Sequence, residues 1–313
     1  MIDRLVTLFG GGGFLGRYVA QDLLHAGARI RIAERHPSSA HFIKPMGQVG
    51  QTQFVSADIT RPESLPRALV NADVAINFVG ILDGAFENVH ADGARNAAEA
   101  AREAEVETFI QISAIGADPQ AASKYARSKA HGEAAVRAIY PDAIVIRPSI
   151  VFGPEDQFIN RFATMARLIP GALPVMRPET RFQPVYVADL AEAVARAAVD
   201  PAPFAGNTYE LGGPEKLSML EINRFVLEAI GRGSKPTLEV PDGIGATMAK
   251  FGWLPGAPIS WDQWLQLGSD NVVAADARGF EAFGISPRPL AAVAHEWLIR
   301  YRTRGRFSET KAA

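Results

Sequence analysis

Residues 5–18 read LVTLFGGGGFLGRY, an apolar run that passes through four consecutive glycines into the start of a helical pattern. A strand can turn sharply and bring its backbone close to a pyrophosphate only where no side chain intervenes, and glycine meets both demands. The helix predicted over 14–26 then directs its first N–H groups, from Phe14 and Leu15 onward, and its positive dipole end toward the phosphates. The stretch therefore predicts a nucleotide-binding loop, with a purely structural turn as the alternative.

The glycines of this loop fit two spacings at once. Gly11, Gly13 and Gly16 match the G-x-G-x-x-G spacing of ordinary dinucleotide-binding folds. Gly10, Gly13 and Gly16 match a wider G-x-x-G-x-x-G spacing. Gly16 lets the helix pack against the sheet in either case. The glycines alone do not choose between the two spacings.

Composition limits the classes of function. The 313 residues are 48% hydrophobic with a net charge of −2, so we expect one large α/β domain with a smaller appended lobe and no whole-chain attraction to nucleic acid. The absence of cysteine excludes disulfides and cysteine nucleophiles and fits a reducing, cytoplasmic interior. The six histidines form no ligand-like cluster, so no metal site is predicted. We also expect no signal peptide, because the first strand is expected from residue 5, and no transmembrane segment, because no apolar run approaches the length of a membrane span.

Apolar runs alternate with amphipathic stretches through the first half of the chain, which predicts a Rossmann-type, doubly wound parallel sheet. We expect its strands at Leu5–Phe9, Arg29–Glu34, Gln53–Ser56, Val74–Phe78, Thr108–Ser113 and Ala143–Arg147. Helices between them are expected at Pro62–Val70, Glu87–Ala104 and Ser123–Tyr140. Pro- and Gly-rich turns replace this rhythm from about residue 149. We therefore expect an NAD(P)-binding domain at residues 1–150 and a smaller C-terminal α/β lobe at residues 151–313.

Two features of the second half leave alternatives open. Residues 300–313 carry five basic residues against one acidic residue, which favours a solvated tail; docking on an acidic partner or an anionic membrane surface is the alternative. Trp261 and Trp264 stand three residues apart. We expect them in the core, with an exposed contact surface as the alternative.

The end of the second strand is where a dinucleotide-binding fold contacts the adenosine ribose. Glu34 would bind the ribose hydroxyls of NAD, whereas Arg35 would pair with the 2′-phosphate of NADP. His36 and Pro37 follow, so the chain leaves the strand at the arginine and the local charge is positive. NADP(H) is therefore favoured over NAD(H). Asp58, after the third strand, is expected to accept a hydrogen bond from the adenine amino group or, equally, to cap the following helix.

Tyr125 and Lys129 share one face of a predicted helix, and Ser113 closes the strand before it. A phenol is a poor proton carrier at neutral pH, but an adjacent ammonium and a nicotinamide ring both favour its ionised form. Lys129 would supply that field and hold the nicotinamide ribose. Ser113 would steady a substrate oxygen while Tyr125 exchanges its proton and the cofactor moves a hydride. An ordinary surface tyrosine and lysine are the alternative.

With these residues in place, the chain resembles the short-chain dehydrogenase/reductase superfamily of the extended or atypical, epimerase/dehydratase-like type. The residues that match its motif positions are Gly10, Gly13, Gly16, Ser113, Tyr125 and Lys129. The resemblance selects the wider glycine spacing. Gly11 and Gly12 are then expected to give the loop conformational freedom without belonging to the motif. It also implies that Asn77, Val79 and Gly80 pass along the adenosine side of the cofactor. The segment around Pro148 is similar to the one that lines the nicotinamide end.

Several runs resemble one branch of that superfamily, the nucleotide-binding accessory subunits of respiratory complex I and their bacterial relatives. These runs are 9–18, 112–134, 147–162, 181–194 and 209–214. The resemblance implies a tightly held, mainly structural NADPH whose phosphate Arg35 contacts. It also implies complex I subunits as partners and peripheral attachment to the inner face of the bacterial inner membrane or its mitochondrial equivalent. An active reductase, epimerase or dehydratase on a small substrate, with a link to ubiquinone metabolism, is the alternative.

The segment between the candidate serine and tyrosine weighs against part of that alternative. Sugar-nucleotide epimerases of the extended type usually carry a longer segment there, often with a second hydroxyl beside the serine. Here eleven residues intervene, and Ala114 follows the serine directly. The epimerase and dehydratase interpretations are therefore weaker than the reductase one.

Overall fold

The computed structural model describes residues 4–254, 257 and 259–303, and the chain divides into two compact units. Unit 1 holds the described residues up to Pro148 together with Val187–Leu211 and Ala274–Ser286; unit 2 holds the other described residues. The chain leaves unit 1 near residue 149, where Pro- and Gly-rich turns replace the alternation of strand and helix patterns. The two later segments of unit 1 could not be predicted from that alternation, because their assignment depends on contacts between distant parts of the chain.

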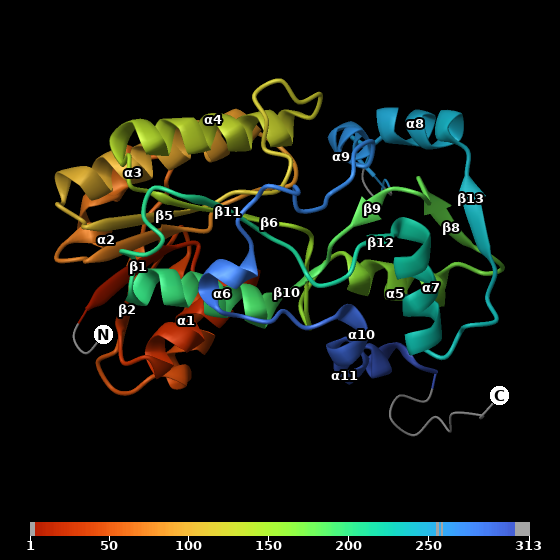
Figure 1. Ribbon diagram of the computed structural model, residues 1–313, viewed down its shortest axis with the longest axis horizontal. Helices are drawn as coiled ribbons and strands as arrows, with labels where there is room; N and C mark the ends of the chain where they lie inside the picture. Colours follow the sequence, from red (N-terminus) through yellow and green to blue (C-terminus); the bar gives the residue numbers. More distant parts are fainter. Residues whose placement is uncertain (1–3, 255–256, 258, 304–313) are drawn as a thin grey trace. The chain divides into compact units, whose positions relative to one another are not determined.

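Unit 1 is built on a seven-stranded sheet whose paired strands all run parallel, in the order β11-β6-β5-β4-β1-β2-β3 (Figure 1). The strands are β1 (Leu5–Phe9), β2 (Arg29–Glu34), β3 (Thr52–Ser56), β4 (Val74–Asn77), β5 (Thr108–Ile112), β6 (Ile144–Pro148) and β11 (Thr208–Leu211). The predicted Rossmann-type fold is confirmed, and six strands lie close to their expected ranges. The seventh, β11, comes from beyond residue 150 and adds to the free edge of β6.

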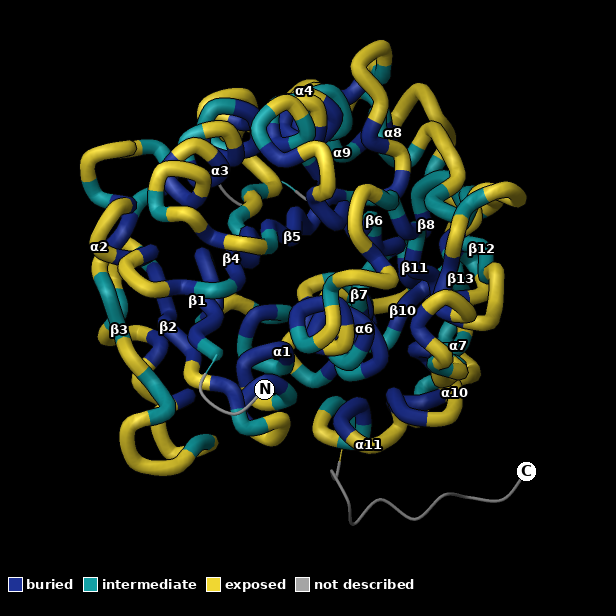
Figure 2. Tube along the Cα trace, turned by 60° about the vertical axis from the view of Figure 1, so that its left-hand side comes forward, coloured by how far each residue is buried: buried dark blue, intermediate teal, exposed yellow. Residues whose placement is uncertain are grey.

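Helices cover both faces of this sheet (Figure 1). The segments are α1 (Phe14–His25), α2 (Pro66–Leu69), α3 (Gly93–Glu103), α4 (Lys124–Ile139), α6 (Val187–Val199), the 3₁₀ segments Pro37–Met46, Pro62–Ser64 and Phe280–Phe283, and the π-helical turn Glu87–Asp92. On one face α1 packs on α6, and on the other α3 packs on α4. Figure 2 shows the sheet strands mostly buried and the connecting turns exposed.

The helix predicted at Pro62–Val70 was wrong as a single element. The chain forms a 3₁₀ turn, with the Leu65 N–H donating to the Pro62 carbonyl at 3.1 Å, and then one turn of α-helix at α2. Pro66 has no N–H to donate to the Pro62 carbonyl, so a continuous α-helix cannot pass this point. Arg31, buried beneath α2, donates to the carbonyls of Ala68 and Val70 at 2.8 and 2.9 Å and satisfies the end of this short helix.

Unit 2 combines short strand pairs with helices. Its segments are β7 (Val151–Phe152), α5 (Ile159–Leu168), β8 (Leu173–Met176), β9 (Arg181–Phe182), β10 (Val185–Tyr186), β12 (Leu217–Ser218), α7 (Met219–Ala229), β13 (Thr237–Val240), α8 (Asp242–Lys250), α9 (Trp261–Gln266), α10 (Leu290–Val293), α11 (His295–Leu298) and a 3₁₀ turn at Ile299–Tyr301. Ser218 begins α7 with a capping box to Glu221, as its sequence pattern favours. The basic residues expected in the tail at 304–313 lie outside the described residues. Arg300 and Arg302 donate to the carbonyls of Pro154 and Ala229.

The two tryptophans of α9 differ in burial. The expectation of a core position holds for Trp264, which is buried, and is wrong for Trp261, the exposed first residue of the helix.

An acidic pair between α1 and α6 gives a first testable prediction. Burial, and then the charge of Glu192, raise the pKa of Asp22 from 3.8 to about 6. The folded chain therefore binds this proton more tightly than the unfolded chain, so the stability it contributes is full below pH 4 and is lost as the pH rises through 6. Asp22→Asn should stabilise the protein at pH 7 by about 1 kcal/mol, since partial exposure screens the pair, and should change little at pH 4. Urea unfolding measures both. Glu99→Gln, an exposed acid on α3, is the control; equal shifts in the two variants would contradict the assignment.

Candidate functional site

The glycine loop connects β1 to α1, and its backbone atoms lie close to one another and to the first turn of α1. Gly10 has a φ of +76°, which favours glycine, and the Gly13 N–H donates back to the Gly10 carbonyl at 3.0 Å. A Cβ on Gly16 would lie 2.6 Å from the Gly11 carbonyl oxygen and 2.7 Å from the Gly11 Cα. Glycine at these positions therefore keeps the first turn of α1 against the loop, as the wider spacing requires.

The expectation that the two central glycines are slack was wrong. A Cβ on Gly11 would lie 2.7 Å from the Leu8 Cβ and 2.8 Å from the Ile32 Cδ1. A Cβ on Gly12 would lie 2.6 Å from both the Ala40 Cβ and a Glu34 carboxylate oxygen. These neighbours come from β2 and the 3₁₀ segment after it, which the loop sequence does not reveal. All of the consecutive glycines are sterically constrained.

The two candidates for ribose recognition have different surroundings. The Glu34 carboxylate accepts the backbone N–H of Gly12, so this acid is already bound to the glycine loop. Arg35 is exposed, and its side chain makes no hydrogen bond or ion pair within the described ranges. Both residues stand at the carboxyl end of β2, beside the loop. The acid therefore shapes the loop while the guanidinium remains available.

Asp58 takes part in a turn beyond β3. Its Oδ1 accepts the N–H and the hydroxyl of Thr60 at 2.9 and 2.7 Å, and its own N–H donates to Ser64 at 2.9 Å. Burial acts to raise the pKa of Asp58, but the Thr60 hydrogen bonds and the charges of Arg35 and Arg61 outweigh it and lower the pKa. The carboxylate thus closes the turn that leads to the 3₁₀ segment at Pro62. Its role toward adenine stays a prediction.

The exit of β4 runs between the glycine loop and α4. Buried Asn77 donates to Gln111 at 3.0 Å and accepts the Val79 N–H at 3.1 Å, which fixes the turn after the strand. A Cβ on Gly10 would lie 3.2 Å from the Val79 side chain. A Cβ on Gly80 would lie 3.2 Å from the Lys129 Nζ. The segment predicted on the adenosine side therefore touches both the loop and the candidate lysine.

Tyr125, Lys129 and Ser113 come together at the carboxyl end of β5. Lys129 is buried, its Nζ lies 5.9 Å from the centre of the Tyr125 ring, and it donates to the Ile112 carbonyl at 3.3 Å. Ser113 is also buried, and its Oγ has no hydrogen-bond partner among the described residues. A buried hydroxyl without a partner is costly unless a bound molecule satisfies it. The Pro148 carbonyl accepts the Ile115 N–H at 3.0 Å, so β6 ends beside this segment.

Burial sets the protonation of the tyrosine and the lysine. It raises the pKa of Tyr125 to about 12, so the phenol holds its proton at neutral pH. It lowers the pKa of Lys129 to about 8, against the opposing charge of Glu133. Glu133 is itself held in a two-point ion pair with Arg147, at 2.9 and 2.7 Å. Lys129 therefore titrates near neutrality beside a proton-carrying tyrosine.

The sequence reasoning missed His90, which packs against Tyr125 with ring centres 5.3 Å apart. Its Nε2 accepts the Ile81 N–H at 2.9 Å, so Nδ1 carries the proton and donates to the Ser128 Oγ at 2.9 Å. Ser128 in turn donates to the Tyr125 carbonyl at 2.9 Å. The histidine thus joins the segment after β4 to the helix that carries the tyrosine and lysine.

One sequence signal could have pointed to this junction. Gly132 lies inside α4, where glycine is unfavourable by about 1 kcal/mol relative to alanine. A Cβ there would overlap the carbonyl oxygen of His90. The π-helical turn that holds His90 had no signal in the sequence, although such turns are frequent at functional sites.

Removing the His90 side chain should destabilise the protein by about 3 kcal/mol at pH 7, because the buried Ser128 hydroxyl and the partly buried Ile81 N–H lose their partner. Burial and then the Lys129 charge lower the pKa of His90 from 6.5 to about 3. Its contribution to stability is therefore full above pH 6.5 and is lost as the pH falls toward 3. Urea unfolding of His90→Ala at pH 7 and pH 5 should show a smaller acid loss than the wild type, by about 2 kcal/mol. His131→Ala, at an exposed histidine of α4, is the control; an equal acid loss in His90→Ala and the wild type would refute the pKa assignment.

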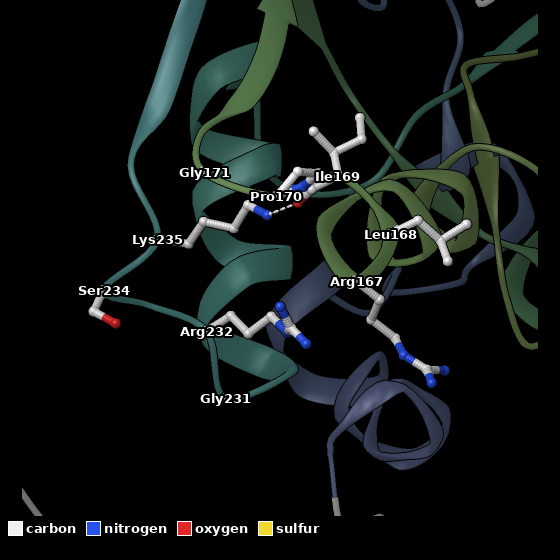
Figure 3. A pocket seen from close by; sticks show the side chains of 9 residues that line it. All are labelled: Arg167, Leu168, Ile169, Pro170, Gly171, Gly231, Arg232, Ser234 and Lys235. Atoms are coloured by element: carbon white, nitrogen blue, oxygen red, sulfur yellow. Dashed lines mark hydrogen bonds between the residues drawn. The ribbon is translucent and has the colours of Figure 1, made fainter.

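A hollow of about 420 Å³ in unit 2 lies outside the predicted residues (Figure 3). Arg167, Arg232 and Lys235 contribute cations to its lining. Lys235 donates to the carbonyls of Ala166 and Ile169, as Figure 3 shows for Ile169. These contacts satisfy the C-terminal end of α5, which gives Lys235 a structural role.

The described part of the chain contains neither a cluster of metal-ligating side chains nor a membrane-spanning helix. No three His, Asp or Glu side chains there gather into a group able to hold a metal ion. None of the helices in the described ranges combines the length and the apolar character that crossing a bilayer requires.

Comparisons with known proteins show the family and the fold of the chain. The sequence model of the NAD dependent epimerase/dehydratase family matches residues 6–212. The chain is 34% identical over 306 residues to NADH dehydrogenase [ubiquinone] 1 alpha subcomplex subunit 9, mitochondrial, of Mus musculus, covering 96% of this chain and 81% of that protein. It is 35% identical over 192 residues to a ceramide reductase of Caulobacter vibrioides, covering 60% and 58%. In structure it resembles the NADPH-dependent quinone oxidoreductase QOR2 of Escherichia coli, with a TM-score of 0.73, 19% identity and 93% and 99% coverage.

Proposed function

We propose that this chain, which belongs to the NAD dependent epimerase/dehydratase family, holds NADP(H) as a mainly structural nucleotide and serves respiratory complex I as an accessory or assembly subunit, or is a bacterial relative of such a subunit. One observation carries the choice of nucleotide. The Glu34 carboxylate is engaged by the Gly12 N–H, while the adjacent Arg35 is exposed and available for a 2′-phosphate. Similarity to a complex I subunit over nearly the whole chain supports the role.

The residues present fit a dinucleotide. The glycine loop offers N–H groups and a helix N-terminus to the pyrophosphate, and close contacts within the protein hold its glycines in that conformation. Lys129 would hold the nicotinamide ribose, and Ser113 has a buried hydroxyl that needs a partner. When bound, the nucleotide supplies hydride chemistry. Tyr125 keeps its proton at neutral pH and can give it to an oxygen held by Ser113.

An active reductase on a small substrate is the second candidate. The observation that favours it is the convergence of Ser113, Tyr125 and Lys129, which a purely structural nucleotide does not need. The similarity to a protein named ceramide reductase supports reduction of a carbonyl or a related group. This second candidate includes a substrate linked to ubiquinone metabolism.

The decisive experiment identifies the nucleotide. Protein purified without added cofactor is denatured, and the released small molecules are examined by absorbance and mass. We expect NADP(H). Protein that releases no nucleotide and shows no thermal shift with NADPH would overturn the proposal.

Two measurements separate the structural role from turnover. Affinity purification of the tagged chain from its native cells should recover complex I subunits if the chain serves that complex. Tyr125→Phe should leave nucleotide content and that association unchanged under the structural role. Under the second candidate it should lower turnover by about 10²–10⁴-fold with nucleotide affinity retained.

The choice of NADP(H) rests on Arg35 and is tested at that residue. Arg35→Ser should weaken NADPH binding about 10- to 100-fold, because a charge-assisted hydrogen bond is worth about 1.5–3 kcal/mol. NADH binding should stay unchanged. Arg61→Ser removes a second exposed arginine near Asp58 and serves as the control. Equal weakening of NADPH and NADH would contradict the assignment.

A further inference from the structure

The buried ammonium of Lys129 has few partners of its own. Its Nζ donates to the Ile112 carbonyl at 3.3 Å and forms no ion pair within the described residues. Burying an unpaired charge is unfavourable, and such a group tends to give up its proton. A neutral amine supplies no field to Tyr125 and is a weaker donor to a ribose hydroxyl. The role proposed for this lysine therefore needs a counter-charge in the surrounding fold.

Glu133 supplies a negative charge from one helical turn away. It stands four residues after Lys129 on α4, the spacing at which two side chains share a face of a helix, and it is buried as well. Its charge opposes the effect of burial on the pKa of Lys129. A charge acts more strongly through a protein interior than through water. The carboxylate is therefore placed to favour the protonated lysine.

The other titratable groups around Lys129 are uncharged near neutral pH. The Tyr125 ring centre lies 5.9 Å from the lysine Nζ, and burial raises the pKa of this phenol to about 12. His90 lies on the π-helical turn that packs on α4, and burial, followed by the lysine charge, lowers its pKa to about 3. Ser113, at the end of β5, has a hydroxyl that does not ionise. Among these neighbours, the charge that favours the ammonium is that of Glu133.

Arg147, on β6, holds that carboxylate in place. Its Nε and one terminal nitrogen donate to the two Glu133 oxygens at 2.9 and 2.7 Å, a fork geometry that fixes the plane of the carboxylate. Its other terminal nitrogen lies 3.5 Å from Glu210 on β11, and Glu210 also accepts the Ala274 N–H at 3.0 Å. Two carboxylates and one guanidinium leave one negative charge. The ammonium of Lys129 balances it.

We propose that Glu133, held by Arg147, is a positioning residue for Lys129, and that its carboxylate keeps the buried lysine protonated and so able to hold the nicotinamide ribose. This consequence rests on the proposed function, since the lysine charge matters there through the bound nucleotide. The alternative is an ion pair that only fastens α4 to β6. Such a pair contributes to stability and has no effect on the lysine titration.

The direct test measures the titration of Lys129 in the full chain without nucleotide. Lysine is labelled with ¹³C at Cε, NMR follows the signals from pH 6 to pH 11, and Lys129→Met identifies the relevant signal by its loss. Glu133→Gln should lower the pKa of Lys129 by about one unit, because the favourable charge is removed. Glu133→Asp keeps the charge and should restore most of that loss. Arg147→Gln should raise the pKa, since the Glu133 charge is then no longer balanced.

Glu107→Gln is the matched control. Glu107 pairs with Arg4 beside the opposite end of β5, so this variant also breaks a pair between glutamate and arginine, and it should leave the Lys129 titration unchanged. Shifts of opposite sign in Glu133→Gln and Arg147→Gln would support the proposal, because a fastening role predicts lost stability without either shift. An unchanged titration in Glu133→Gln, or an equal fall in the control, would overturn it.

A double variant keeps the test possible if a single variant does not fold. Glu133→Gln with Arg147→Met replaces both charges by neutral side chains of similar size, a change that buried ion pairs usually tolerate. It should still lower the pKa of Lys129. A titration like that of the wild type in the double variant would contradict the proposal.

NADPH affinity tests the consequence for binding. Glu133→Gln should bind NADPH like the wild type at pH 6 and about fivefold more weakly at pH 8, where a smaller fraction of its Lys129 is protonated. An equal loss of affinity at both pH values would overturn the proposal, because it would indicate a distorted site. A wild type that binds no NADPH would overturn the proposed function instead, and the titration without nucleotide would still decide whether Glu133 keeps the lysine charged.

Discussion

Gly16→Ala is expected to lower NADPH affinity by at least about 100-fold and to destabilise the protein by about 3 kcal/mol. A Cβ at this position would meet the Gly11 carbonyl oxygen, the Gly11 Cα and the Gly10 carbonyl oxygen at 2.6, 2.7 and 2.8 Å. All three atoms belong to the backbone, so no side-chain rotation relieves the overlap. Either α1 moves away from the sheet or the loop opens, and both displace the N–H groups that would bind the pyrophosphate. Calorimetric titration with NADPH and urea unfolding measure the two effects.

Two further glycine variants serve as a control and as a milder change in the same loop. Gly243→Ala, in α8, introduces a Cβ with no heavy atom within 4 Å among the described residues, so it should leave stability and binding unchanged or slightly improve stability. Gly13→Ala meets the Gly10 carbonyl oxygen at 3.1 Å and should fold with weakened binding, which keeps the test informative if Gly16→Ala fails to fold. Binding within a few-fold of wild type in both loop variants would show that the loop does not hold the nucleotide.

The elements that could be predicted from the sequence are those whose conformation depends on residues close together in the chain. The run from Leu5 to Phe9, the glycines and the helix after them form one strand, turn and helix whose pattern is complete within 25 residues. The break at Pro66 could also have been predicted, because a proline inside a helix leaves the carbonyl four residues earlier without its N–H partner. The pairing of β11 with β6 could not be predicted, because its short pattern gains meaning only beside a free sheet edge.

The candidate site divides in the same way. Ser113, Tyr125 and Lys129 could be placed together because parallel strands and the helices after them meet at the carboxyl edge of the sheet. The sequence could not show the shifts of the lysine and tyrosine pKa values, which come from burial. It also could not show that Glu34 binds Gly12, since this contact spans 22 positions and depends on the loop conformation. Long-range contacts thus decide the electrostatics of residues that local patterns identify.

Lys129→Met is expected to raise the free energy of unfolding and to lower the affinity for NADPH. Burial lowers the pKa of Lys129 from 10.5 to about 8, so at neutral pH the folded chain keeps a charge that its surroundings disfavour. Methionine has a similar length and no charge, and replacing a buried charge by an apolar side chain is often stabilising. We expect a gain of about 1–2 kcal/mol in the free energy of unfolding at pH 7. Urea unfolding measures it.

The pH dependence identifies the source of that gain. The folded-state pKa of Lys129 lies below the unfolded value, so the unfolded chain binds more protons between pH 8 and 10.5 and the stability of the wild type rises across that range. The variant has no such group, and its advantage should shrink as the pH approaches 10. An advantage that stays constant from pH 7 to pH 10 would show that the lysine is not held at a lowered pKa.

The same substitution, Lys129→Met, should lower NADPH affinity although it raises the stability of the fold. An ammonium that donates to a ribose hydroxyl is worth about 1.5–3 kcal/mol, so NADPH affinity should fall about 10- to 100-fold in Lys129→Met. Lys216→Met removes an exposed lysine from unit 2 and should change neither quantity. A structural lysine would show lost stability with unchanged affinity. Gained stability together with lost affinity is expected only where the fold tolerates a buried charge because a ligand needs it, which is the usual trade between stability and function at a binding site.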